Sequence, residues 1–276
     1  MSMAIRRNQL LVIIAAIAVT IVLYFLPQKN QSDTKETENN TEGGYSFNRI
    51  ITQAKGQLKP EELAPIQKLE EALAKEEGNL LLLDSLGKMW DLALFPVVSA
   101  HYFEQIATKL PEEKSWLNAA YRYFDAFKGS NDSILRSMMV NKAIASYQKV
   151  LDINPANLNA KTDLGVCYAE GTAEPMKGIL LLREVVEKDP KHANAQFNLG
   201  VLSVRSGQLD KAIERFEKVL EAQPDKVEAR YLLGRTLIQL GQSQKGVEQL
   251  KEIQKYTSDP QVLEEVNKLI HQVNNQ

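Results

Sequence analysis

The sequence predicts an all-α protein in which a pair of helices is repeated along the chain. Leucine followed by glycine recurs at Leu164, Leu199 and Leu233, at spacings of 35 and 34 residues, and a further copy lies at Leu86. A period of this length is typical of helical solenoids. Aromatic residues make up only 7% of the 276 residues, which favours helices rich in alanine, leucine, lysine and glutamate over sandwiches and barrels.

Other landmarks keep the same phase as the leucines. Small residues and large apolar residues follow the leucines by 13 and 17 positions, as Ala212 and Phe216 follow Leu199. Glycines are placed to end the first helix of the later units, at Gly171, Gly207 and Gly241. Prolines suit the turns that follow the second helices, and they lie at Pro111, Pro155, Pro190 and Pro224.

This combination resembles the tetratricopeptide repeat, whose pattern is W-x2-L-G-x2-Y, then A-x3-F, then P. The resemblance implies a helix-turn-helix solenoid, wound as a right-handed superhelix, in which neighbouring units bury one another's apolar faces. It covers residues 80–260 as five tetratricopeptide-like repeats, at 80–112, 113–157, 158–192, 193–226 and 227–260.

The second unit departs from the pattern. Its second helix, marked by Ala143, Tyr147 and Val150, arrives about ten residues late. The extra residues, near 127–139, either lengthen the helices or form a protruding loop, and insertions in solenoids map to one face.

Helices are also expected at both ends of the repeats. N-terminal helices occupy residues 46–79, with an amphipathic helix at 60–75 and a shorter one around Phe47 and Ile50. Residues 261–276 form a C-terminal capping helix, with one apolar stripe that includes Val266 and Leu269.

The N-terminus carries a membrane-span pattern. Only Thr20 interrupts the apolar and aromatic residues from 10 to 26, and Pro27 then stops the helix. A helix from Asn8 to Gln28 is about 30 Å long, the thickness of a bilayer core. We expect a transmembrane signal-anchor at 10–27. Cleavage as a signal peptide is the alternative, although no small-residue cleavage site follows.

Charge predicts the orientation of this span. Arg6 and Arg7 precede it, so residues 1–9 are expected in the cytoplasm. Residues 28–45 are polar and suit a flexible linker. The predicted location is therefore the inner (cytoplasmic) membrane, single-pass, with the C-terminal domain in the periplasm.

The sequence offers no pattern for catalysis. The three histidines lie in different units, at His101, His192 and His271, and Cys167 is the single cysteine. Metal sites and catalytic triads need such side chains to converge. A net charge of −2 provides no basic field for nucleic acid. We expect no enzyme activity, no catalytic or metal site, no cofactor and no nucleic-acid partner.

The resemblance implies that the first helices line a concave groove that binds protein or peptide. Arg205 or Arg235 would hold a ligand carboxylate, and aromatic residues would act as anchors. In the alternative, Phe197 and Tyr231 pack inside the superhelix. The implied groove residues are Leu117, Tyr121, Phe124, Asn159, Thr162, Val166, Asn194, Phe197, Val201, Arg205, Tyr231, Arg235 and Ile238.

The family's clamp for chaperone C-termini is incomplete in this chain. Asn198 matches its middle element, whereas Thr162, Val166, Glu228 and Leu232 occupy positions where the clamp has lysine, asparagine or arginine. Binding of chaperone tails is therefore not expected.

The predicted function is that of a membrane-tethered scaffold or adaptor. It looks like the bacterial membrane-anchored tetratricopeptide proteins that assist translocation, cytochrome c assembly or envelope complexes. The alternatives are a self-associating structural protein, which would be a homo-oligomer, and a periplasmic chaperone-like accessory factor.

Overall fold

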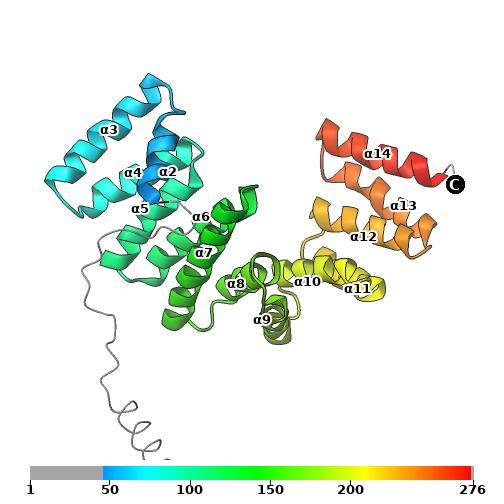
Figure 1. Ribbon diagram of the computed structural model, residues 1–276. Helices are drawn as coiled ribbons and strands as arrows, with labels where there is room; N and C mark the ends of the chain where they lie inside the picture. Colours follow the sequence, from blue (N-terminus) through cyan, green and yellow to red (C-terminus); the bar gives the residue numbers. More distant parts are fainter. Residues whose placement is uncertain (1–45, 275–276) are drawn as a thin grey trace, which may run out of the picture. The chain divides into compact units, whose positions relative to one another are not determined.

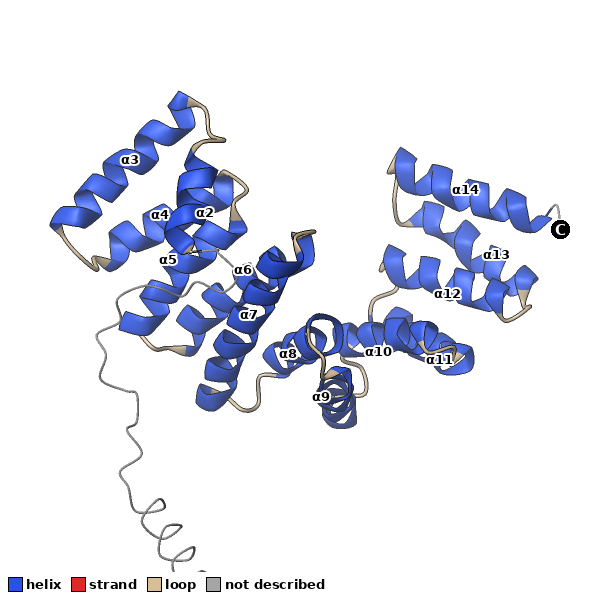
Figure 2. Ribbon diagram, in the orientation of Figure 1, coloured by secondary structure: helices blue, strands red, loops and turns tan. Residues whose placement is uncertain are grey.

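The computed structural model describes residues 46–274, and this part of the chain consists of α-helices, one 3-10 turn and no strands (Figures 1 and 2). The helices are α2 (Phe47–Lys55), α3 (Pro60–Lys75), α4 (Leu80–Leu92), α5 (Pro96–Lys109), α6 (Glu113–Gly129), α7 (Ser133–Ile153), α8 (Leu158–Gly171), α9 (Pro175–Lys188), α10 (Ala193–Arg205), α11 (Leu209–Ala222), α12 (Val227–Gln239), α13 (Ser243–Glu252) and α14 (Pro260–Asn274), with the 3-10 turn η1 at Ile253–Lys255.

The fold is a succession of helix pairs. Each of the five repeat ranges contains two helices, from α4 and α5 in residues 80–112 to α12 and α13 in residues 227–260. The two helices of a pair pack against each other, and the second then packs against the first helix of the next pair. The all-α helical solenoid expected from the sequence is therefore present.

Local sequence explains where many of these helices begin. The side chains of Asn79, Asp132 and Asn157 accept hydrogen bonds from backbone amides in the first turns of α4, α7 and α8, which satisfies donors that a helix start leaves unpaired. Proline opens α5 and α9, where its missing amide hydrogen costs little.

The extra residues of the second unit lengthen both of its helices. Helices α6 and α7 run for 17 and 21 residues, and only residues 130–132 separate them. The added turns bury Phe127, Met139 and Val140. The guanidinium of Arg136 lies 4.2 Å from the centre of the Phe127 ring. The insertion therefore enlarges the core of this unit, and no protruding loop is formed.

Two different requirements for glycine operate at the ends of the first helices. Gly207 and Gly241 have φ values of 72° and 83°, the left-handed region that favours glycine. Gly171 does not, and a Cβ there would lie 2.4 Å from Val140 Cγ2. Gly171 is therefore required by the close approach of the long second unit. In the first unit the equivalent turn residue is Leu94, which has φ 62°.

The predicted membrane span lies outside the described residues. Among residues 46–274, no helix combines the length and the apolar content needed to cross a membrane. The cytoplasmic N-terminus at 1–9, the span at 10–27 and the linker at 28–45 stay predictions.

Candidate protein-binding surface

The candidate surface is the first-helix face, defined by the predicted groove residues of α6, α8, α10 and α12. Five of them are exposed, and they are Tyr121, Asn159, Asn194, Arg205 and Arg235. Six are partly buried, and they are Leu117, Phe124, Phe197, Val201, Tyr231 and Ile238. Both apolar and charged groups are thus presented on this face, as protein-binding surfaces require.

Two of the predicted groove residues are buried and offer no surface. Thr162 is 1% exposed, and its hydroxyl donates to the backbone oxygen of Leu158 at 2.8 Å. Val166 belongs to a core cluster that includes Leu182 and Leu199. The reason is that α8 contacts the first helices on both sides, α6 and α10. The expectation that Thr162 and Val166 line a groove was therefore wrong.

Phe197 and Tyr231 are held by packing within the array. The Phe197 ring centre lies 6.0 Å from the Phe216 ring centre, and Lys226 Nζ lies 5.4 Å from the Phe197 ring centre. The Tyr231 hydroxyl donates to Glu265 Oε1 at 2.6 Å. Burial, followed by this hydrogen bond, raises the pKa of Tyr231. These contacts favour the alternative in which the two rings stabilise the array.

The two arginines of the face differ in their surroundings. Arg205 Nη1 lies 3.4 Å from Glu170 Oε1, and Lys128 pairs with the same carboxylate. A ligand carboxylate at Arg205 would therefore compete with Glu170. Arg235 forms no ion pair within residues 46–274, and its guanidinium lies 5.7 Å from the Tyr231 ring centre. Arg235 is thus the better placed of the two for a ligand.

Comparison with known proteins identifies the later helix pairs. Models of the tetratricopeptide repeat match residues 181–214 and 203–264. The chain contains tetratricopeptide repeats. The helical pairs upstream of residue 181 continue the same architecture.

The relatives of this tetratricopeptide protein are distant. The mitochondrial import receptor subunit TOM70 of Mus musculus is 25% identical over 116 residues, or 42% of this chain, and its counterpart in Rattus norvegicus is 24% identical over the same length. The match spans only 17% of either TOM70 chain.

A solved structure of a MamA protein shares the fold. MamA 41-end from Desulfovibrio magneticus RS-1 aligns with a TM-score of 0.50 at 16% identity, over 64% of this chain and 94% of that chain. YrrB, described as a TPR protein with an unusual peptide-binding site, aligns with a TM-score of 0.45 at 17% identity, over 72% of this chain and 97% of that chain.

Sequence reasoning missed the contribution of the first helix pair, α4 and α5. Leu81 and Leu92 are each 79% exposed. They lie five residues before and six residues after Leu86, the same offsets that Asn194 and Arg205 have from Leu199. Eleven residues make about three helical turns, so both leucines lie on one side of α4. We therefore add Leu81 and Leu92 to the first-helix face. The available signal was the run of four leucines at 80–83. An amphipathic helix has one apolar stripe, so four consecutive leucines cannot all face the core.

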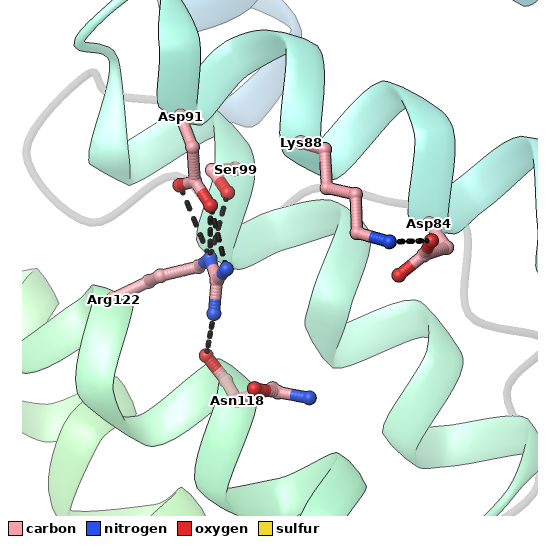
Figure 3. Close-up of polar contacts among 6 residues, drawn as sticks. All are labelled: Asp84, Lys88, Asp91, Ser99, Asn118 and Arg122. Carbon is pink, nitrogen blue, oxygen red and sulfur yellow. Dashed lines mark hydrogen bonds and ion pairs between the residues drawn. The ribbon is translucent and has the colours of Figure 1, made fainter.

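A polar network fixes this first unit against the second (Figure 3). Arg122 of α6 donates to Asp91 of α4 at 2.5 and 2.9 Å from Nη2 and Nε, and to the Ser99 hydroxyl of α5 at 3.0 Å. Its guanidinium lies 3.7 Å from the Phe103 ring centre. By contrast, Lys88 and Asp84 form a local pair within α4 at 2.6 Å. Arg122 therefore positions Leu81 and Leu92 relative to Tyr121.

A partly buried carboxyl lies behind the aromatic part of the face. Tyr147 donates to Asp163 Oδ2 at 3.2 Å, and the rings of Tyr121 and Phe124 pack on Tyr147 at 6.1 and 6.3 Å. Burial raises the pKa of Asp163 to about 6, the Tyr147 hydrogen bond opposes this shift, and the Asp125 carboxylate adds to it. The Asp163 carboxyl therefore has its pKa closer to neutral pH than an ordinary aspartate does.

Two of the histidines, His101 and His192, take structural positions. His192 Nδ1 accepts from the Ala195 amide at the start of α10, and its other nitrogen lies 3.1 Å from Asn159 Oδ1. The His101 ring stacks on Phe47 with ring centres 4.5 Å apart. No group of three or more potential metal ligands occurs in the part of the chain that the structure describes.

Proposed function

We propose that this protein is a membrane-tethered adaptor whose tetratricopeptide array binds a protein partner through the first-helix face, in the assembly of an envelope complex. The observation that carries the proposal is the exposure of Leu81 and Leu92 on one side of α4. Large apolar side chains exposed together mark interaction sites more often than single ones do.

The geometry defines the kind of partner. Leu81 and Leu92 lie about 16 Å apart along α4, at 1.5 Å per residue. Tyr121, 40% exposed, adds an aromatic group from the next unit. An amphipathic helix with apolar residues spaced over three turns fits these features.

The tether rests on the sequence of the N-terminus. The uncharged stretch at 10–26 has the length of a bilayer span, and Arg6 and Arg7 favour a cytoplasmic N-terminus. The array would then lie in the periplasm. Protease added to spheroplasts should digest the array, whereas full protection of it would contradict this topology.

Charge substitution tests the binding face. We expect Leu81→Glu with Leu92→Glu to abolish co-purification of the partner from cells, because two apolar side chains that the partner would cover are replaced by charges that must be desolvated. Met176→Glu is the matched control, since Met176 is 63% exposed at the start of a second helix. Equal loss of the partner in the control and the double variant would contradict the proposal.

Self-association is the second candidate, and the exposed side chain of Leu94 beside Leu92 favours it. In that case light scattering of the full chain would give a dimer or larger species that Leu81→Glu with Leu92→Glu returns to a monomer. A monomer at tens of micromolar would exclude self-association as the main role.

A further inference from the structure

A second candidate site lies away from the first-helix face, between the second helices of two neighbouring repeats. A pocket of about 370 Å³ is formed where α9 and α11 both pack on α10. This volume is near the lower end of the range for ligand sites, roughly 300–1,000 Å³. Its apolar part is made by Ile179, Leu199 and Leu202, and its polar part includes Arg183, Ser203, Ser206, Gln208, Lys211 and Arg215.

The pocket holds three cationic side chains without a carboxylate partner. Arg183, Lys211 and Arg215 come from α9 and α11, and none forms an ion pair with an acidic side chain within residues 46–274. By contrast, two nearby cations are paired: Lys161 of α8 with Glu184 of α9, and Lys218 with Glu214 within α11. The pocket therefore carries net positive charge, which an anionic group of a ligand would complement.

One of these cations is oriented by the core. Arg215 Nη1 donates to Gln196 Oε1 at 2.7 Å, and Gln196 in turn donates to the backbone oxygen of Pro190 at 2.7 Å. Gln196 is 1% exposed. Its fixed position holds the guanidinium of Arg215 at the pocket, which reduces the side-chain entropy lost on binding a ligand.

We propose that this pocket binds the C-terminal carboxylate of a partner polypeptide whose last residue is leucine, isoleucine or valine. A C-terminal residue carries a carboxylate and an apolar side chain on the same Cα. The three cations match the carboxylate, and arginine suits it because of its paired donors. Ile179, Leu199 and Leu202 match the apolar side chain. The small volume admits about one or two residues, so a long segment would not fit.

This site does not depend on the proposed function of the first-helix face. Leu81 and Leu92 lie on α4, whereas the pocket is made by α9, α10 and α11. A partner could therefore use either surface alone.

Peptide titration with the full-length protein in mild detergent tests the proposal. The probe is a fluorescent hexapeptide of glycine and serine that ends in leucine with a free carboxylate, and its binding is followed by anisotropy. The comparison peptides are the same sequence with a C-terminal amide, one ending in glycine, and an amidated one with an internal glutamate. We expect binding of the first peptide only, because the others lack the carboxylate, the apolar group or their joint position.

Two exposed cations give the variants. Arg183→Gln and Lys211→Gln should each weaken binding of the leucine peptide about tenfold or more, since each removes a charge-assisted hydrogen bond. Lys188→Gln makes the same change of charge at an exposed position of α9 outside the pocket and should alter binding by less than about twofold. Circular dichroism confirms that the variants are folded, and Leu81→Glu with Leu92→Glu should leave peptide binding intact.

Three results would overturn the assignment. Equal binding of the peptide with the C-terminal amide would show that the carboxylate is not recognised. Equal binding of the peptide with the internal glutamate would show that a C-terminal position is not required. Unchanged affinity of the folded Arg183→Gln and Lys211→Gln variants would exclude this pocket as the binding site.

Discussion

Gly178→Ala should destabilise the third repeat, because Gly178 is the point of closest approach between α8 and α9. A Cβ at Gly178 would lie 2.2 Å from the backbone oxygen of Gly165 and 2.5 Å from the backbone nitrogen of Ala169. Ordinary van der Waals contact begins at 3.4 Å. Both contacted atoms belong to the backbone of α8, so no side-chain rotation can relieve them.

The magnitude follows from two opposing effects. Alanine in a helix is favoured over glycine by up to about 1 kcal/mol. Against this, the two helices must separate by about 1 Å, and overpacking of a close contact costs about 1–3 kcal/mol. Leu182 and Val185, fully buried on α9, would also lose contacts. We expect a net loss of about 1–2 kcal/mol in the free energy of unfolding.

Gly129→Ala provides the matched control. Gly129 ends α6, and a Cβ there would meet nothing within 4 Å. This variant should be unchanged or more stable by a few tenths of a kcal/mol. Urea denaturation followed by circular dichroism measures both changes, and the slope of the transition shows whether the repeats still unfold together. If Gly178→Ala is as stable as the wild type, the close packing of α8 on α9 is not as described.

Three further predictions concern individual side chains. Leu94→Gly should raise the free energy of unfolding by about 0.5 kcal/mol in urea denaturation. A leucine at φ 62° is strained by roughly 1–2 kcal/mol, and glycine gives back about 0.5–1 kcal/mol of that gain through chain entropy, while the 85% exposed side chain contributes little packing. A less stable variant would contradict this prediction. Arg122→Lys should lower the free energy of unfolding by about 2 kcal/mol, since lysine cannot hydrogen-bond to Asp91 and Ser99 together or stack on Phe103. The control Lys88→Arg keeps the exposed pair with Asp84 and should change the free energy of unfolding by less than about 0.5 kcal/mol. Asp163→Asn should stabilise the protein by up to about 2 kcal/mol at pH 7.5 and by little at pH 4. The folded state raises the pKa of Asp163 from 3.8 to about 6, so the stability that the protonated carboxyl contributes is present below pH 3.8 and is lost as the pH rises to about 6. An equal gain at both pH values in urea denaturation would rule this explanation out.

The periodicity of the sequence predicted the helix pairs because it reflects local requirements. Leu199 and Phe216 are core positions of one hairpin, and Gly207 is demanded by its turn. The extra turns that α6 and α7 gain from the insertion were one of two outcomes that the sequence left open. The core around Phe127 decided between them, and that core depends on contacts with the third unit that no local pattern encodes.

The binding surface was harder to predict than the fold. Family positions assume that every repeat has the same neighbours, but α8 is covered by both α6 and α10, which buries Thr162 and Val166. Exposure of Leu81 was likewise hidden, since leucine is usually a core residue. The cations Arg183 and Arg215 come together only when α9 and α11 pack on α10, so their sequence separation carries no signal.

Site-specific photo-crosslinking in cells tests the central claim, that the first-helix face binds a protein partner, most directly. A photoreactive amino acid would replace Leu92 or Tyr121, which are exposed on this face, with Met176 as the control position. We predict one dominant protein adduct from positions 92 and 121 and none from position 176, with the adduct identified by mass spectrometry. The same adducts from all three positions, or no adduct from positions 92 and 121, would contradict the claim.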